Sequence, residues 1–252
     1  MNDSLAQRRA AFRALHNHGC FIIPNPWDGG SATRLQALGF KALASSSSAA
    51  ALALGLTDHQ ITIDQKIAHL EMLCAATDLP VNADFESGFA DTPEGVAANV
   101  KRAIATGIAG LSIEDQLTKG TLYPLEKAVQ RIAAARAAID ASGADVMLVA
   151  RTEAYLNDIK DVGFVNERLN AFAQAGADCL FAPGMTDPDE IASTVRAVAP
   201  KPVNVLIMNA DMRVADLAAL GVRRVSVGGA LAGAAWRAFD QAAAALAEQF
   251  PA

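Results

Sequence analysis

Glycines that end helical segments recur along this chain, and they constrain its fold more than any other feature. Each follows a helical, mostly Ala-rich run and comes one to four residues before a short apolar run. The positions are Gly39, Gly107, Gly143, Gly176 and Gly221. Because glycine adopts the left-handed conformation just past a helix end without steric cost, each position predicts a helix that stops and a strand that follows. The pattern therefore predicts a chain of repeated strand–helix units.

Short apolar runs supply the strands of these units. We predict eight, at Phe21–Pro24, Lys41–Ser45, Pro80–Phe85, Gly110–Glu114, Asp145–Arg151, Asp178–Phe181, Pro202–Leu206 and Arg224–Val227. Eight such units in 252 residues have the number and size of a (β/α)8 barrel, so we predict an α/β fold of the TIM-barrel type. An extra N-terminal helix before Cys20 would cover the bottom of the barrel. An open doubly wound sheet is the alternative, weakened because no Gly-x-Gly-x-x-Gly motif follows the first strand. No linker divides the chain, so we predict a single domain over residues 1–252.

Composition limits the partners of the chain. The formal net charge is -6 and no basic run is present, which argues against nucleic acid and anionic membrane surfaces as partners. No uninterrupted apolar stretch is long enough to predict a membrane span. The cysteines are Cys20, Cys74 and Cys179, which are far apart and lack metal-ligand spacing. They indicate buried thiols in a reducing, cytoplasmic setting.

Acidic residues gather where the third and fourth predicted strands end. Asp84 and Glu86 follow an apolar run, and by strand alternation they point to the same face. Glu114 ends the next strand, which a barrel places beside them. Several acids at one barrel mouth need a cation, and Mg²⁺ fits because it takes a few carboxylates and keeps waters for a chelating substrate. A surface acidic loop that caps the next helix is the alternative for Asp84 and Glu86.

Polar residues at the other strand ends extend this predicted site, because the active sites of such barrels lie at the carboxyl ends of the strands. Trp27 follows the first strand, next to Asp28, which either lines the mouth or caps a helix. Ser45, Ser46 and Ser47 follow the second and offer hydroxyl and backbone N–H groups to an anion, or simply cap a helix. The remaining residues are Asp58 in the next loop, Arg151 on the inward face of the fifth strand, and Asn204 on the inward face of the seventh. Arg151 clamps a substrate carboxylate, neutralises the acids, or does both.

Four segments, taken together, resemble the phosphoenolpyruvate mutase/isocitrate lyase superfamily. The resemblance rests on Pro24-Asn25-Pro26-Trp27-Asp28, Asp84-Phe85-Glu86-Ser87-Gly88-Phe89, Ser112-Ile113-Glu114-Asp115-Gln116 and Val149-Ala150-Arg151-Thr152-Glu153-Ala154. It runs in order over nearly the whole chain. It implies a (β/α)8 barrel and a Mg²⁺-dependent reaction, with Mn²⁺ as a substitute, on a small 2-oxo or 2-hydroxy carboxylic acid.

The resemblance also implies roles for individual residues. Asp58, Asp84, Glu86 and Glu114 would hold the metal, often through water. The substrate would meet the metal, the backbone around Ser46 and Ser47, and Arg151, which would stabilise an enolate-like pyruvyl group. Longer relatives exchange a terminal helix between subunits, so we expect a homo-oligomer, a dimer or a tetramer.

One loop departs from the superfamily. Isocitrate and methylisocitrate lyases carry a Lys-Cys-Gly-His loop after the fourth strand, whereas residues 117–123 here contain neither Cys nor His. We therefore expect a Mg²⁺-dependent lyase with chemistry of the oxaloacetate decarboxylase type, whose proton donor is Tyr123, Lys119 or a metal-bound water. The alternatives are a phosphonomutase or phosphonopyruvate hydrolase acting on a C–P bond, and a barrel that binds a 2-oxo acid without turnover.

Overall fold

The structure, a computed structural model, describes residues 4–249, so the first three and last three residues of the predicted domain lie outside it. Eight parallel strands form one sheet in the order β1-β10-β9-β8-β7-β4-β3-β2. Their bounds are β1 Phe21–Ile23, β2 Leu43–Ala44, β3 Val81–Asp84, β4 Gly110–Glu114, β7 Met147–Arg151, β8 Cys179–Phe181, β9 Val203–Leu206 and β10 Arg224–Ser226. The edges β1 and β2 come together where the N–H of Ala44 donates to the carbonyl of Pro24, 3.0 Å away. The sheet is therefore a nearly closed barrel, which confirms the predicted fold class.

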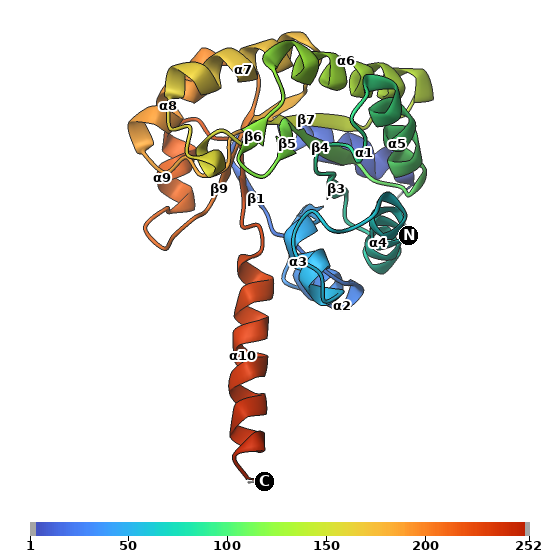
Figure 1. The fold of residues 1–252 in the computed structure, drawn as a ribbon, viewed down its shortest axis with the longest axis vertical. Coiled ribbons are helices and arrows are strands. Elements are labelled where there is room, and N and C mark those ends of the chain that lie inside the picture. The colour runs from blue at the N-terminus through green and yellow to red at the C-terminus, as the bar shows by residue number, and fades with distance from the viewer. Residues whose placement is uncertain (1–3, 250–252) are drawn as a thin grey trace.

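Helices surround this barrel (Figure 1). Their bounds are α1 Leu5–Ala14, α2 Gly29–Ala37, α3 Ser47–Ala53, α4 Ile63–Ala76, α5 Pro93–Ala105, α6 Leu125–Ser142, α7 Val162–Gln174, α8 Pro188–Ala197, α9 Val214–Ala219 and α10 Ala230–Ala247, with a short 3₁₀ helix η1 at Tyr155–Asn157. The five glycines that predicted the strand–helix connections all have positive φ angles, between 66° at Gly143 and 102° at Gly176. No helix in this part of the chain combines the length and apolarity needed to cross a membrane.

Two clusters of the apolar core position the site, one outside the barrel and one at its floor. Leu111 and Ile113 point outward from β4 into the large cluster between sheet and helices, as strand alternation predicts. At the floor, Phe12 of α1 packs against Ile23 and Met147 from the inner face of the barrel. The predicted N-terminal helix therefore closes the bottom, which leaves the opposite end of the barrel open for a site.

A small hairpin follows β4 and was not predicted. It consists of β5 Gln116–Thr118 and β6 Thr121–Leu122. A buried ion pair fastens its base, because the Nε of Arg168 donates to Asp115 over 2.7 Å and its Nη2 donates to the carbonyl of Tyr123. The hairpin thus stands beside the open end of the barrel.

The last helix does not pack along the barrel wall. Figure 1 shows α10 extending away from the barrel, and among its described residues only Ala232 is buried. The helix starts directly after Gly229, and its apolar face lies open to solvent.

Candidate active site

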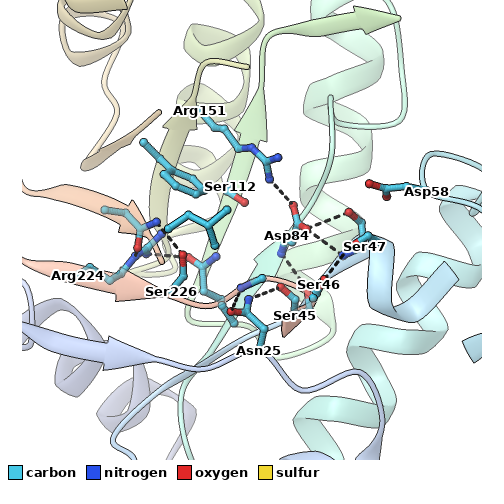
Figure 2. A pocket seen from close by; sticks show the side chains of 18 of the residues that line it. Asn25, Ser45, Ser46, Ser47, Asp58, Asp84, Ser112, Arg151, Arg224 and Ser226 are labelled. Atoms are coloured by element: carbon cyan, nitrogen blue, oxygen red, sulfur yellow. Dashed lines mark hydrogen bonds and ion pairs between the residues drawn. The ribbon is translucent and has the colours of Figure 1, made fainter. Parts of the chain in front are cut away.

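A polar cavity of about 200 Å³ occupies the open, carboxyl end of the barrel (Figure 2). Seven residues predicted for the site line it, namely Ser45, Ser46, Ser47, Asp58, Asp84, Arg151 and Asn204. Others that line it were not predicted as site residues, among them Asn25, Ser112, Arg224 and Ser226. The rule that such sites form at the carboxyl ends of barrel strands therefore placed most of the polar lining correctly.

Asp84 ends β3 and is the most heavily bonded acid of the cavity. Its Oδ2 accepts from both the backbone N–H (2.9 Å) and the hydroxyl (3.0 Å) of Ser47, and its Oδ1 lies 3.5 Å from Nη1 of Arg151. Burial alone would raise the pKa of Asp84, but Arg151, Lys66 and the bonds from Ser47 together hold it below its ordinary value. Asp84 is thus an ionised carboxylate. It accepts the N–H of Ser47 at the start of α3, a group that we predicted to bind a substrate anion.

Glu86 and Glu114 lie beside it with unsatisfied oxygens. Glu86 is not in the strand but in the turn after it, with φ 45°, so strand alternation was the wrong reason for its position. Its carbonyl accepts the N–H of Glu114, which brings the ends of β3 and β4 together. The Oε1 atoms of both glutamates are buried and have no hydrogen-bond partner among the described residues. Burial raises the pKa of Glu114 well above its ordinary value, and the nearby Glu153 and Asp84 add to this while Arg151 opposes it.

Arg151, at the end of β7, links the acids from across the barrel. Its guanidinium pairs with Asp84 and Glu114 at 3.5 Å each and forms a closer pair with Glu153. Burial disfavours its charge, but these carboxylates outweigh burial and raise the pKa of Arg151. The sequence left open whether Arg151 clamps a substrate or neutralises the acids, and in this structure it neutralises them.

Two further cationic groups were missed as site residues. His59 follows Asp58, and its Nδ1 lies 3.4 Å from Glu86 and 3.9 Å from Glu114. The bond to Glu86 outweighs burial and raises the pKa of His59 to about 9. Lys66 of α4 is fully buried, and its Nζ donates to the hydroxyl of Ser45, 3.4 Å away. Nothing in the spacing of Lys66 distinguishes it from an exposed helical lysine, so only its burial reveals it.

These residues fit a hydrated divalent cation better than a fully protein-ligated one. Within residues 4–249, no three His, Cys, Asp or Glu side chains form a ready-made set of metal ligands. Mg²⁺ does not need such a set, because proteins commonly hold it through one or two carboxylates while waters and substrate complete the shell. The orphaned oxygens of Glu86 and Glu114 are buried acceptors of the kind that such a hydrated ion satisfies.

Five predicted residues do not line the cavity. Glu86 and Glu114 stay next to it through their contacts with His59 and Arg151, whereas Tyr123, Lys119 and Trp27 lie elsewhere. The hydroxyl of Tyr123 donates to Asp91 at 3.0 Å, and its ring packs in the outer core. Lys119 is exposed in the turn of the β5–β6 hairpin. Trp27 lines a separate apolar groove, and its carbonyl is bonded to His69. Asp28 caps α2, because its side chain accepts the backbone N–H of Ser31. Of the two roles predicted for Asp28, lining the mouth or capping a helix, the structure shows the cap.

Known proteins resemble this chain in sequence over most of its length. A family model for phosphoenolpyruvate phosphomutase matches residues 12–247. An oxaloacetate decarboxylase from Paraburkholderia xenovorans LB400 is 31% identical over 87% of this chain and 74% of its own length. A 2-methylisocitrate lyase from Escherichia coli K12 is 33% identical over 73% of this chain and 64% of its own.

A solved structure extends the likeness to three dimensions. A Burkholderia cenocepacia J2315 protein, provisionally assigned as a lyase/mutase, superposes with a TM-score of 0.92 and 46% identity. The match covers 95% of this chain and 87% of that one. The barrel, its acidic mouth and these matches agree that the chain belongs to the phosphoenolpyruvate phosphomutase family, within the phosphoenolpyruvate mutase/isocitrate lyase superfamily.

Proposed function

We propose that this protein is a Mg²⁺-dependent lyase that cleaves a C–C bond in a small 2-oxo or 2-hydroxy carboxylic acid. The observation that carries the proposal is the meeting of Asp84, Glu86 and Glu114 with Arg151 at the mouth of the barrel. A family of lyases and mutases, with an oxaloacetate decarboxylase among the relatives, supports the reaction class.

The residues of the chain would bind and polarise the substrate. Arg151 is only 18% exposed and is held by three acids, so its N–H groups are fixed in place before the substrate arrives. A preorganised cation of this kind stabilises the negative charge that develops on a keto oxygen as the C–C bond breaks. Ser46, on the other wall of the cavity, offers its hydroxyl group to the substrate carboxylate, whereas the hydroxyl of Ser47 already donates to Asp84.

Asp84, Glu86, Glu114 and Asp58 would hold the metal. When bound, Mg²⁺ supplies Lewis-acid polarisation of the substrate oxygens and a template that orients them. Asp58 is half exposed and lines the cavity, so it would close the site from the solvent side. Neither Tyr123 nor Lys119 lines the cavity, so we no longer propose them as the proton donor.

A substrate panel tests the reaction class. Purified protein is incubated with oxaloacetate, 2- and 3-substituted malates and 2-methylisocitrate, with Mg²⁺ and with EDTA. We expect at least one acid to be cleaved with Mg²⁺ and none with EDTA, followed by pyruvate or glyoxylate release. If no acid on the panel is cleaved, the lyase proposal is wrong. Tight Mg²⁺-dependent binding of oxalate without turnover would instead favour a binding barrel.

Cleavage of a C–P bond is the second candidate. It is favoured by the family model and by a 35% identical Burkholderia cenocepacia J2315 structure, provisionally assigned as a phosphonomutase, which matches 98% of this chain. Phosphonopyruvate incubated with the protein and Mg²⁺ separates the two reactions. Loss of its ³¹P signal to phosphoenolpyruvate or phosphate would replace the C–C proposal.

Replacing Asp84 tests the metal site independently of turnover. We expect Asp84→Ala to weaken Mg²⁺-dependent oxalate binding at least ~100-fold in calorimetry, because losing even an outer-shell partner costs 10- to 100-fold. The matched control is Asp64→Asn, which alters an exposed acid paired with Arg102. Unchanged oxalate binding in Asp84→Ala would contradict the metal site.

A further inference from the structure

The floor of the cavity carries an arginine that pairs with no carboxylate in the described part of the chain. Arg224 begins β10, is 3% exposed and lines the cavity. Its Nε donates to the amide oxygen of Asn204 at 2.9 Å, and its Nη1 to that of Asn82 at 3.4 Å. Both acceptors are neutral, and none of the ion pairs formed within residues 4–249 includes Arg224.

The two arginines of the cavity therefore differ in how far acidic side chains neutralise their charge. Arg151 is paired with Asp84, Glu114 and Glu153, so a substrate anion must compete with three acids for it. No acid within residues 4–249 competes for Arg224. A guanidinium has five N–H donors, and the two bonds to amides leave donors for a further acceptor.

The ionisable groups around Arg224 do not supply the missing negative charge. Cys179 is buried next to it on β8, and burial raises the pKa of this thiol despite the arginine. His16, in the turn that follows α1, carries no negative charge in any state, and its pKa is lowered to about 3 by burial, with Arg224 contributing. A buried charge without a partner costs several kcal/mol, so an anion in the cavity would remove a real penalty.

The interior of this barrel is also built differently from most. Such barrels are usually filled with layers of branched aliphatic side chains. Here amide and hydroxyl side chains line the cavity. Figure 2 shows the lining side chains between Arg224 and the pair of Asp84 and Arg151. Asn82 and Asn204, which accept from Arg224, line this lower end, and Asn204 donates in turn to Ser226. A water's share of the liquid is about 30 Å³, so the cavity of about 200 Å³ has room for a small acid.

We propose that Arg224 binds the far carboxylate of a diacid substrate whose reacting end lies against Arg151 and the acid cluster. The cavity would thus select 2-oxo and 2-hydroxy acids that carry a second carboxylate. The inference rests on the proposed function for the position of the reacting end, but it concerns binding and not turnover.

Matched acid pairs test it. Malate is compared with 2-hydroxybutanoate, and 2-oxoglutarate with 2-oxopentanoate, because the members of each pair differ mainly in the far carboxylate. Dissociation constants are measured by calorimetry in Mg²⁺. In the wild type we expect the diacid of at least one pair to bind about 10- to 100-fold more tightly, as a hydrogen bond to a charged group allows. Equal binding within both pairs overturns the proposal.

Three substitutions separate charge from shape. Arg224→Met and Arg224→Gln should abolish the preference for the diacid while leaving the monoacid constant within about twofold, which also shows that the site is folded. Arg224→Lys keeps the charge and should keep part of the preference. A preference that survives in Arg224→Met contradicts the role of Arg224.

A second probe and the substrate panel distinguish the remaining outcomes. If inorganic phosphate binds the wild type but not Arg224→Met, and the diacids show no preference, Arg224 serves a free anion and the proposal is wrong. Failure of turnover with a preserved diacid preference contradicts the proposed function alone. Turnover without any diacid preference contradicts only this inference.

Discussion

At the scale of single residues, His16 makes stability depend on pH. It is 6% exposed, its Nδ1 shares a hydrogen bond with the carbonyl of Phe12 at 2.9 Å, and its Nε2 is buried without a partner. Burial lowers its pKa from 6.5 to about 3. The unfolded chain binds a proton below pH 6.5 and the folded chain does not, so stability falls as pH drops from about 6.5 toward 3. At pH 5 we expect this histidine alone to cost about 2 kcal/mol of unfolding free energy relative to pH 8.

Urea unfolding at pH 5 and pH 8 measures this dependence. His16→Gln should show a smaller drop between the two pH values than the wild type does. The control, His18→Gln, removes an exposed histidine next to the same helix. Equal drops in the wild type and His16→Gln would mean that His16 is protonated in the folded protein.

The sequence revealed site residues where a simple rule applied to them. Asp84, Glu114 and Arg151 end strands, and the rule for barrel mouths placed them together correctly. Lys66 and Arg224 escaped notice for opposite reasons. Lys66 lies in an outer helix and reaches the strand ends only through its long side chain, whereas Arg224 starts its strand, at the end where no site was expected.

At the scale of elements, the β5–β6 hairpin depends on the buried pair of Arg168 and Asp115. The two side chains are 5% and 1% exposed, and Asp115 also accepts the N–H of Glu153. We expect Arg168→Met to lower the unfolding free energy by about 3–5 kcal/mol, because it leaves a buried carboxylate uncompensated. Arg168→Met with Asp115→Asn should recover much of this loss, since the amide still accepts the N–H without a charge. Urea unfolding measures both.

An exposed ion pair gives the matched control. Arg102 pairs with Asp64 at 2.6 Å, but both side chains are exposed, so Arg102→Met should cost less than about 1 kcal/mol. A similarly small loss of unfolding free energy for Arg168→Met would show that the buried Arg168–Asp115 pair stabilises the fold no more than an exposed pair does.

The hairpin also shows which elements a sequence pattern can predict. The eight barrel strands and most helices stood out because apolar runs and terminal glycines repeat. The hairpin strands have three and two residues, too few to show a period, and Leu117 faces solvent. Its position depends on hydrogen bonds that Arg168 and Tyr123 donate, and no local sequence pattern predicts these bonds.

At the scale of the whole molecule, α10 bears on the predicted homo-oligomer, which stays a prediction. The helix has 18 residues and exposes large apolar side chains. They are Leu231, Trp236, Phe239 and Leu246, with exposed fractions of 37%, 39%, 62% and 60%. A folded monomer rarely leaves such a continuous apolar face in water, because covering it is favourable by about 25 cal/mol per Å².

We therefore expect a second copy of the chain to cover α10, and light scattering with gel filtration to give a multiple of 26.2 kDa. Trp236→Ser with Phe239→Ser should shift the protein toward the monomer, because these rings meet edge to face on the exposed side of the helix, with centroids 5.9 Å apart. Gln241→Ser, on the same helix, is the control and should keep the wild-type mass.

Since α10 follows directly on Gly228 and Gly229, which line the cavity, loss of the oligomer should also weaken acid binding if the partner holds this segment in place. A wild-type mass of one chain at micromolar concentration would contradict the oligomer.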